Sequence, residues 1–130
     1  MKSVKRAMVL AAGKGLRMRP LTDKTPKPLN SFMGRPLIDH VIERLEEAGV
    51  EEIVINGHYF ADALEAHLKA HRSSARILVA DEREILLDTG GGIKKALPVL
   101  GSDPIITFNS DSVWLEGSGS NLRRLIESFD

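Results

Sequence analysis

Four short apolar runs alternate with segments of helical periodicity, and this alternation restricts the possible fold more than any other feature of the chain. The runs are rich in valine and isoleucine and too short for typical helices, so they are predicted to be buried strands. A strand–helix–strand order favours a mainly parallel sheet with helices on both faces, because parallel neighbours must be joined by a long crossover. The sequence therefore predicts an α/β fold with strands at 7–11, 52–56, 76–80 and 104–109.

The segments between these runs carry apolar side chains at helical spacing. The pattern from 37 to 48 is the clearest, since Pro36 precedes it and Gly49 follows it, as is typical of a helix start and stop. No repeat or linker divides the 130 residues, which are enough for one domain with one core. Weaker stripes predict further helices at 61–68, 93–97 and 122–129.

Charge and composition exclude several classes of function. The 18 lysines and arginines balance 18 aspartates and glutamates, so no net charge attracts the chain to nucleic acid or to an anionic membrane. The absence of cysteine excludes a disulfide framework and is compatible with a reducing cytosol. No apolar run reaches membrane-spanning length. We expect a cytoplasmic protein without nucleic-acid or membrane partners, whose oligomeric state the sequence does not indicate.

The histidines do not suggest a metal site. His67 and His71 are four residues apart on one face of a predicted helix, but their surroundings are charged and no third ligand is evident. His40 and His58 are expected to be structural or exposed to solvent. No zinc site is predicted.

Two strand ends are candidates for a ligand site. Open parallel sheets bind ligands beyond the carboxyl ends of their strands, where the winding reverses. If the chain winds outward from the first strand and returns for the fourth, the segments AAG at 11–13 and NSD at 109–111 meet there. Both interrupt apolar strands with glycine or polar side chains, so a ligand site is predicted between them.

The stretch LAAGKGLRMRPLTDKTPKPL, residues 10–29, has the composition of a phosphate-binding loop. Gly13 and Gly15 allow the backbone to approach a ligand and to turn N–H groups toward an anion. No Gly-Lys-Ser/Thr follows, so this is not a Walker loop, and Met18 stands where a dinucleotide-binding fingerprint needs its third glycine.

Two cations follow the glycines. Arg17 can make bidentate bonds to phosphate oxygens, and Lys27, between Pro26 and Pro28, offers a point charge at a defined place. Either alone could be a solvated loop residue. Their combination at this spacing favours phosphate binding.

The same stretch resembles the signature of the sugar-phosphate nucleotidyltransferases, or nucleotide-sugar pyrophosphorylases. The resemblance extends over all 130 residues and includes GRPLIDHVIERLEEAGVEEIVIN at 34–56, LLDTGGGIKKALPVLG at 86–101 and FNSD at 108–111. Within the family, the segment DTGGGIKKALPVLG is most similar to N-acetylmuramate 1-phosphate uridylyltransferases.

The resemblance implies a fold and a reaction. The fold is a Rossmann-like three-layer sandwich of the nucleotide-diphospho-sugar transferase type. The reaction is Mg²⁺-dependent: a nucleoside triphosphate, here UTP, joins a sugar 1-phosphate, such as N-acetylmuramate 1-phosphate in peptidoglycan recycling, and pyrophosphate is released. Family catalytic domains are considerably longer, so residues 1–130 are expected to be the nucleotide-binding part of a single domain, without the C-terminal sugar-binding part.

The family pattern also implies residue roles. It places Arg17 on the β- and γ-phosphates and Lys27 on the α-phosphate. Asp111 would hold Mg²⁺, the alternative being an aspartate that caps a turn, and Asn109 would contact the ribose or the sugar. The other implied nucleotide-binding residues are Ala12, Gly13, Gly15, Leu16, Gly90 and Gly91.

Two segments leave alternatives open. The commoner family loop has threonine where this chain has Leu16, so only a backbone role transfers to that position. The glycines at 90–92 are expected to precede a helix whose free N–H groups could bind a base or a phosphate. Glu82, Arg83 and Glu84 could reach the base edge, but a solvated charged loop is the favoured interpretation.

Two rival functions belong to other classes. A nucleotide-binding module without catalysis would keep the base pocket, but the presence of Arg17, Lys27 and Asp111 favours an enzyme. A dinucleotide-dependent oxidoreductase conflicts with the missing third glycine and with Asn56, which ends the second strand where an acidic ribose ligand is expected.

Overall fold

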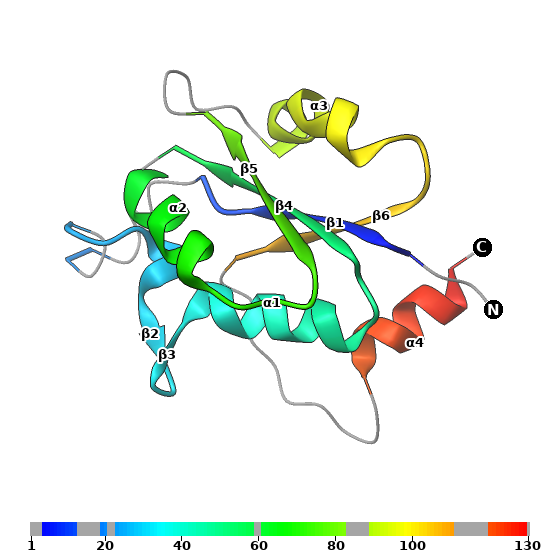
Figure 1. Ribbon diagram of the computed structural model, residues 1–130, viewed down its shortest axis with the longest axis horizontal. Helices are drawn as coiled ribbons and strands as arrows, with labels where there is room; N and C mark the ends of the chain where they lie inside the picture. The colour runs from blue at the N-terminus through cyan, green and yellow to red at the C-terminus, as the bar shows by residue number, and fades with distance from the viewer. Residues whose placement is uncertain are drawn as a thin grey trace.

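The computed structural model describes residues 4–12, 19–20, 23–58, 61–82, 89–110 and 120–129 (Figure 1). Strands and helices alternate as the sequence predicts. In chain order the elements are β1 (Arg6–Leu10), the 3-10 helix η2 (Lys27–Leu29), β2 (Ser31–Phe32), β3 (Arg35–Pro36), α1 (Leu37–Glu47), β4 (Glu52–Gly57), α2 (Ala61–Ala70), β5 (Arg76–Asp81), α3 (Thr89–Leu100), β6 (Ile105–Asn109) and α4 (Asn121–Ser128).

The central sheet has four strands in the order β5-β4-β1-β6, and every pairing in it is parallel. The chain therefore winds outward from β1 through β4 to β5 and then returns to the other side of β1 for β6. The reversal of winding on which the predicted ligand site depends is therefore present. It places β1 at the centre, with the carboxyl ends of β4 and β6 on either side of its own.

Helices cover both faces of the sheet: α1, α2 and α4 lie on one face and α3 on the other (Figure 1). Successive residues of a strand point to opposite faces, so each buried strand contributes to two cores. In β1, Ala7 and Val9 pack in the core beneath α1, whereas Met8 packs against Ala96 of α3. The α/β sandwich predicted from the alternation is confirmed.

The ends of α1 agree with the sequence signals. Pro36 precedes its first residue, and Gly49 follows its last turn with φ +87°. The N–H groups of Gly49 and Val50 donate to the carbonyl oxygens of Glu46 (3.0 Å) and Leu45 (3.1 Å). Glycine reaches this left-handed conformation without the steric cost of a Cβ, so it ends the helix and satisfies its last carbonyls.

Two features differ from the sequence expectation. The glycine run does not precede α3 but forms part of its first turn, because the helix begins at Thr89. The hairpin of β2 and β3 was not predicted at all. Its turn residues Met33 (φ 51°) and Gly34 (φ 81°) both have positive φ, as the tight turns of two-residue hairpins require.

Candidate active site

The carboxyl ends of β1 and β6 lie side by side. Leu10 is the register partner of Asn109, and the N–H of Ser110 donates to the carbonyl oxygen of Leu10 at 3.3 Å. The two segments singled out in the sequence therefore leave the sheet at neighbouring points. Ala12 is buried here and Asn109 is exposed.

A side chain from β4 holds the backbone just beyond β1. The N–H of Ala11 donates to Oδ1 of Asn56 at 2.5 Å, and the Asn56 residue is only 4% exposed. The side chain of Asn56 thus accepts a hydrogen bond that a backbone carbonyl of a neighbouring strand would otherwise accept. It does so at the point where the chain leaves the sheet for the glycine-rich stretch. Its removal would leave a buried N–H without this acceptor, which costs about 1–3 kcal/mol. Sequence reasoning used Asn56 only as evidence against an oxidoreductase and missed this role.

Glu82, directly after β5, is 1% exposed. Its N–H donates to the carbonyl of Gly57 at 2.8 Å, and its own carbonyl lies 2.6 Å from Nδ1 of His58. The favoured interpretation of Glu82 as part of a solvated loop is therefore wrong, whereas the structural role of His58 is confirmed. Burial of an acidic side chain is unusual and marks this strand end as a specialised environment.

The first turn of α3 closes over Asn56 and Glu82. A Cβ placed on Gly92 would lie 3.2 Å from Nδ2 of Asn56 and 3.2 Å from Oε2 of Glu82. Position 92 therefore requires glycine, because the helix packs here against two buried polar side chains. Gly90 is exposed, and a Cβ there would meet nothing within 4 Å. Packing within the described residues does not explain Gly90.

The helix start also has a favourable electrostatic character. The first four N–H groups of an α-helix have no partner within the helix, and they carry the positive end of its dipole. In α3 these groups belong to residues 89–92, and Gly92, the last of them, packs against the buried side chain of Glu82. The Nζ of Lys95 donates to the carbonyl of Asp81, which ties the second turn to the end of β5.

Lys27 begins the 3-10 helix η2, between the buried residues Pro26 and Pro28. Asn30 fixes this segment, since its N–H donates to the carbonyl of Lys27 (3.1 Å) and its side chain to that of Pro26 (3.1 Å). The carbonyl of Asn30 in turn accepts from the N–H of Leu37 at 2.9 Å. Lys27 therefore sits on a backbone anchored to the first residue of α1.

Of the other predicted positions, Gly91 is half-buried in the first turn of α3. Asn109, predicted to contact the ribose or the sugar, ends β6 and is exposed. The predicted positions that lie outside the described residues are Gly13, Gly15, Leu16, Arg17, Arg83, Glu84 and Asp111.

A second cluster of polar groups lies between α1 and α2. His67 Nε2 is 2.6 Å from Oδ1 of Asp39, and His71 Nδ1 is 3.6 Å from the same oxygen. The expectation that the two histidines lack a third neighbour is therefore wrong. Asp39 is 28 residues away from His67 in the sequence, so only the packing of the two helices reveals it.

A hollow of about 330 Å³ lies at the opposite edge of the sheet. Its lining comes from residues that precede β1, β4 and β6 or begin these strands, and it includes the ion pair of Arg6 with Glu52 (3.3 Å). Ligands of open α/β sheets bind at the carboxyl ends of the strands, so this hollow is not the candidate site.

Among the helices of the described residues, none combines the length and apolar character needed to cross a membrane.

The fold and the arrangement of the strand ends agree with a comparison to known families. The model of the Nucleotidyl transferase family matches residues 6–129, and the chain belongs to this family. It is therefore related to enzymes that transfer nucleotidyl groups, as the sequence signature predicts.

Individual relatives give a finer comparison. The chain is 50% identical over 127 residues to N-acetylmuramate alpha-1-phosphate uridylyltransferase of Caulobacter vibrioides, with 95% of this chain and 52% of the relative covered. The protein of the same name from Neisseria meningitidis serogroup B is 46% identical over 107 residues, covering 82% of this chain and 46% of the relative. The chain thus spans about half the length of these relatives.

Solved structures share the fold. UDP-glucose pyrophosphorylase from Acinetobacter baumanii superimposes with a TM-score of 0.84 at 24% identity, covering 95% of this chain and 52% of that one. At this identity the likeness establishes the α/β architecture alone.

Proposed function

We propose that the protein transfers a uridylyl group from UTP to a sugar 1-phosphate and releases pyrophosphate, with N-acetylmuramate 1-phosphate as the sugar substrate. The family membership supports nucleotidyl transfer, and the names of the relatives at 50% and 46% identity support the base and the sugar. The observation that carries the proposal is the meeting of the carboxyl ends of β1 and β6, next to β4, whose Asn56 lies against the glycine-rich first turn of α3.

The proposed reaction is an in-line displacement at the α-phosphorus. An oxygen of the sugar phosphate forms a new bond to this phosphorus while the bond to the bridging α–β oxygen breaks, and pyrophosphate leaves with the negative charge. The nucleophile is already anionic, so the protein needs no general base. The catalytic work is positioning and neutralisation of charge.

Arg17 and Lys27 are proposed to supply this neutralisation. Arg17 would hold the leaving β- and γ-phosphates, and Lys27 the α-phosphate. The support for Lys27 is its anchored backbone, because Pro26, Pro28 and Asn30 restrict where the side chain starts. A preorganised cation loses little entropy when it binds a phosphate.

Asp111 is proposed to hold Mg²⁺, and Asn109, two residues earlier, to contact the ribose or the sugar. When bound, the ion would neutralise phosphate charge and orient the triphosphate. The support is the place of this segment, since Asn109 ends β6 beside the end of β1. The glycine-rich loop from Ala12 through Leu16 would then enclose the phosphates from the other side.

The uracil is proposed to lie against the first turn of α3. Gly90 is exposed and a Cβ there would meet nothing within 4 Å, so a ligand could approach the backbone at this residue. A backbone-lined surface of this kind suits a small pyrimidine. We therefore expect UTP to bind more tightly than GTP or ATP.

Pyrophosphate release by the complete encoded polypeptide tests the proposal. UTP, GTP and ATP are each combined with the 1-phosphates of N-acetylmuramate, N-acetylglucosamine, glucose and mannose, in the presence of Mg²⁺. Turnover is expected with UTP and N-acetylmuramate 1-phosphate at about 1 s⁻¹ or faster, as is usual for enzymes. Preference for GTP with mannose 1-phosphate would refute the substrate assignment. UTP binding without turnover on any sugar would favour the non-catalytic module instead.

A further inference from the structure

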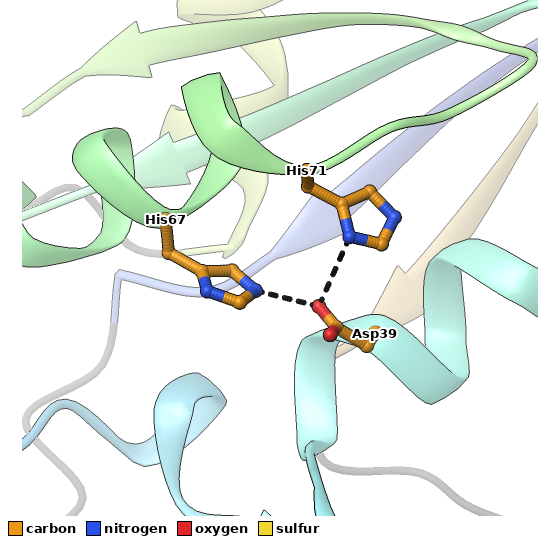
Figure 2. Close-up of side chains that lie close together, drawn as sticks. All are labelled: Asp39, His67 and His71. Carbon is orange, nitrogen blue, oxygen red and sulfur yellow. Dashed lines mark hydrogen bonds and ion pairs between the residues drawn. The ribbon is translucent and has the colours of Figure 1, made fainter.

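Three side chains that could bind a metal converge between α1 and α2, away from the strand ends that form the candidate active site. Figure 2 shows His67 and His71 pointing from one end of α2 toward Asp39 in the first turn of α1. Their ligand atoms all lie within 4.8 Å of one another. The two imidazole rings are 6.0 Å apart and tilted by 33°.

The fold holds these side chains in place from both helices. Leu64 and Leu68 of α2 are buried in the same core as Ile38 of α1, so the two helices are fixed against each other. His71 follows the last residue of α2, but its N–H donates to the carbonyl of His67 at 3.0 Å. This bond continues the helical turn and keeps both rings on one face of α2.

We propose that Asp39, His67 and His71 form a binding site for a divalent transition-metal ion of the Zn²⁺ class. Zn²⁺ binds histidine nitrogen at about 2.0–2.1 Å and carboxylate oxygen at about 2.0–2.2 Å, so tetrahedral ligands lie about 3.3 Å apart. The separations of Asp39 Oδ1 from His67 Nε2 (2.6 Å) and from His71 Nδ1 (3.6 Å) bracket this value. Small rotations of the side chains are sufficient to admit the ion.

The ligand set selects the class of metal. Two imidazoles and one carboxylate suit Zn²⁺, Co²⁺ and Ni²⁺, whereas Mg²⁺ prefers oxygen ligands only. All three side chains are partly exposed, with 28% for His67, 20% for His71 and 13% for Asp39, so water can complete the coordination. The bound ion would take the place of the hydrogen bond between His67 and Asp39. This site is separate in chemistry and position from the proposed Mg²⁺ site.

A bound ion would join the beginning of α1 to the end of α2. Binding to the folded but not the unfolded state raises the melting temperature by mass action. The site is therefore expected to stabilise the fold, and its occupancy does not depend on nucleotide. Its test is independent of the proposed enzymatic activity.

The experiment uses the protein without an affinity tag, after removal of metals with a chelator. Titration calorimetry with ZnCl₂ is expected to give one saturable site, and the melting temperature is expected to rise with Zn²⁺ but not with equimolar Mg²⁺. Co²⁺ should give the visible absorption of a low-coordinate site with nitrogen and oxygen ligands. His71→Ala and His67→Ala should each weaken Zn²⁺ binding at least tenfold, because they remove a ligand.

His40→Ala is the matched control, since His40 also lies on α1 but contacts Phe32 and Arg35 of the β2–β3 hairpin. This variant should bind Zn²⁺ like the unchanged protein. If a histidine-to-alanine variant does not fold, His71→Gln removes the same ligand with less loss of volume. Absence of a saturable site, or equal binding by the His71 and His40 variants, would overturn the proposal and leave the cluster as a structural ion pair.

Discussion

Gly92→Ala tests whether the first turn of α3 packs as closely as the structure indicates. The new Cβ would lie 3.2 Å from both Asn56 Nδ2 and Glu82 Oε2, so these side chains must move by a few tenths of an ångström. Neither moves easily, because both are almost fully buried and Asn56 also accepts the hydrogen bond from Ala11. Overpacking of a buried site of this kind costs about 1–3 kcal/mol.

Gly90→Ala is the matched control for this substitution. The two glycines are two residues apart in the same helical turn, so both variants gain a similar helix propensity, at most about 1 kcal/mol. A Cβ at Gly90 meets nothing within 4 Å. The difference in stability between the two variants therefore isolates the steric contribution, which is expected to be about 1–3 kcal/mol.

Thermal and urea unfolding of both variants measure this difference. The Gly92 variant should melt about 3–10 °C below the Gly90 variant. The effects on UTP affinity should be reversed. Gly90→Ala should weaken UTP binding more than Gly92→Ala does, because it covers the exposed backbone proposed to bind the base while leaving the fold intact. Equal stabilities of the two variants would show that α3 does not pack as closely against Asn56 and Glu82 as the structure indicates.

Four further predictions concern single side chains. Asn56→Ala should lower the free energy of unfolding by about 1–3 kcal/mol, measured by urea titration, because it removes the acceptor of a buried N–H. Lys27→Ala should lower kcat about a hundredfold to a thousandfold. Arg17→Ala should also raise KM for UTP, because Arg17 is proposed to bind phosphate charges that are already present before the reaction. Steady-state kinetics together with a thermal melt separate these losses from unfolding. The hydrogen bond from Arg35 lowers the pKa of Glu43 below the ordinary value of a glutamate, so this pair stabilises the fold at neutral pH and the contribution is lost as the pH falls through the lowered pKa. The pair is largely exposed, so Glu43→Gln should cost less than about 1 kcal/mol at pH 7 in urea titration and reduce the loss of stability between pH 5 and pH 3.

The elements of regular structure could be predicted because their signals are local. Buried strands appear as short runs of branched apolar residues, and α1 is marked by Pro36, its apolar stripe and Gly49. General rules also apply to the connections between strands. Parallel strands need crossovers, and ligand sites lie where the winding reverses. The likeness to nucleotidyltransferases likewise depends on contiguous segments, and the family match confirms it.

The hairpin of β2 and β3 escaped prediction because its strands are two residues long and its turn is Met33-Gly34 rather than a sequence rich in asparagine or aspartate. The start of α3 was placed too late because consecutive glycines oppose helix formation in isolation. In the folded protein a larger residue than Gly92 would be crowded by Asn56 and Glu82, which the sequence alone does not reveal.

The amino-acid sequence was enough to predict the α/β class, the order of strands and helices and, if the winding reverses, the segments that meet at the ends of β1 and β6. Those properties arise from periodicity and from chirality, which act over short stretches of chain. The folded structure was needed to show that Glu82 is buried, that Asn56 accepts a hydrogen bond from Ala11, and that Asp39 lies beside His67 and His71. Each of these depends on contacts between residues far apart in the sequence, and such contacts exist only after the helices have packed on the sheet.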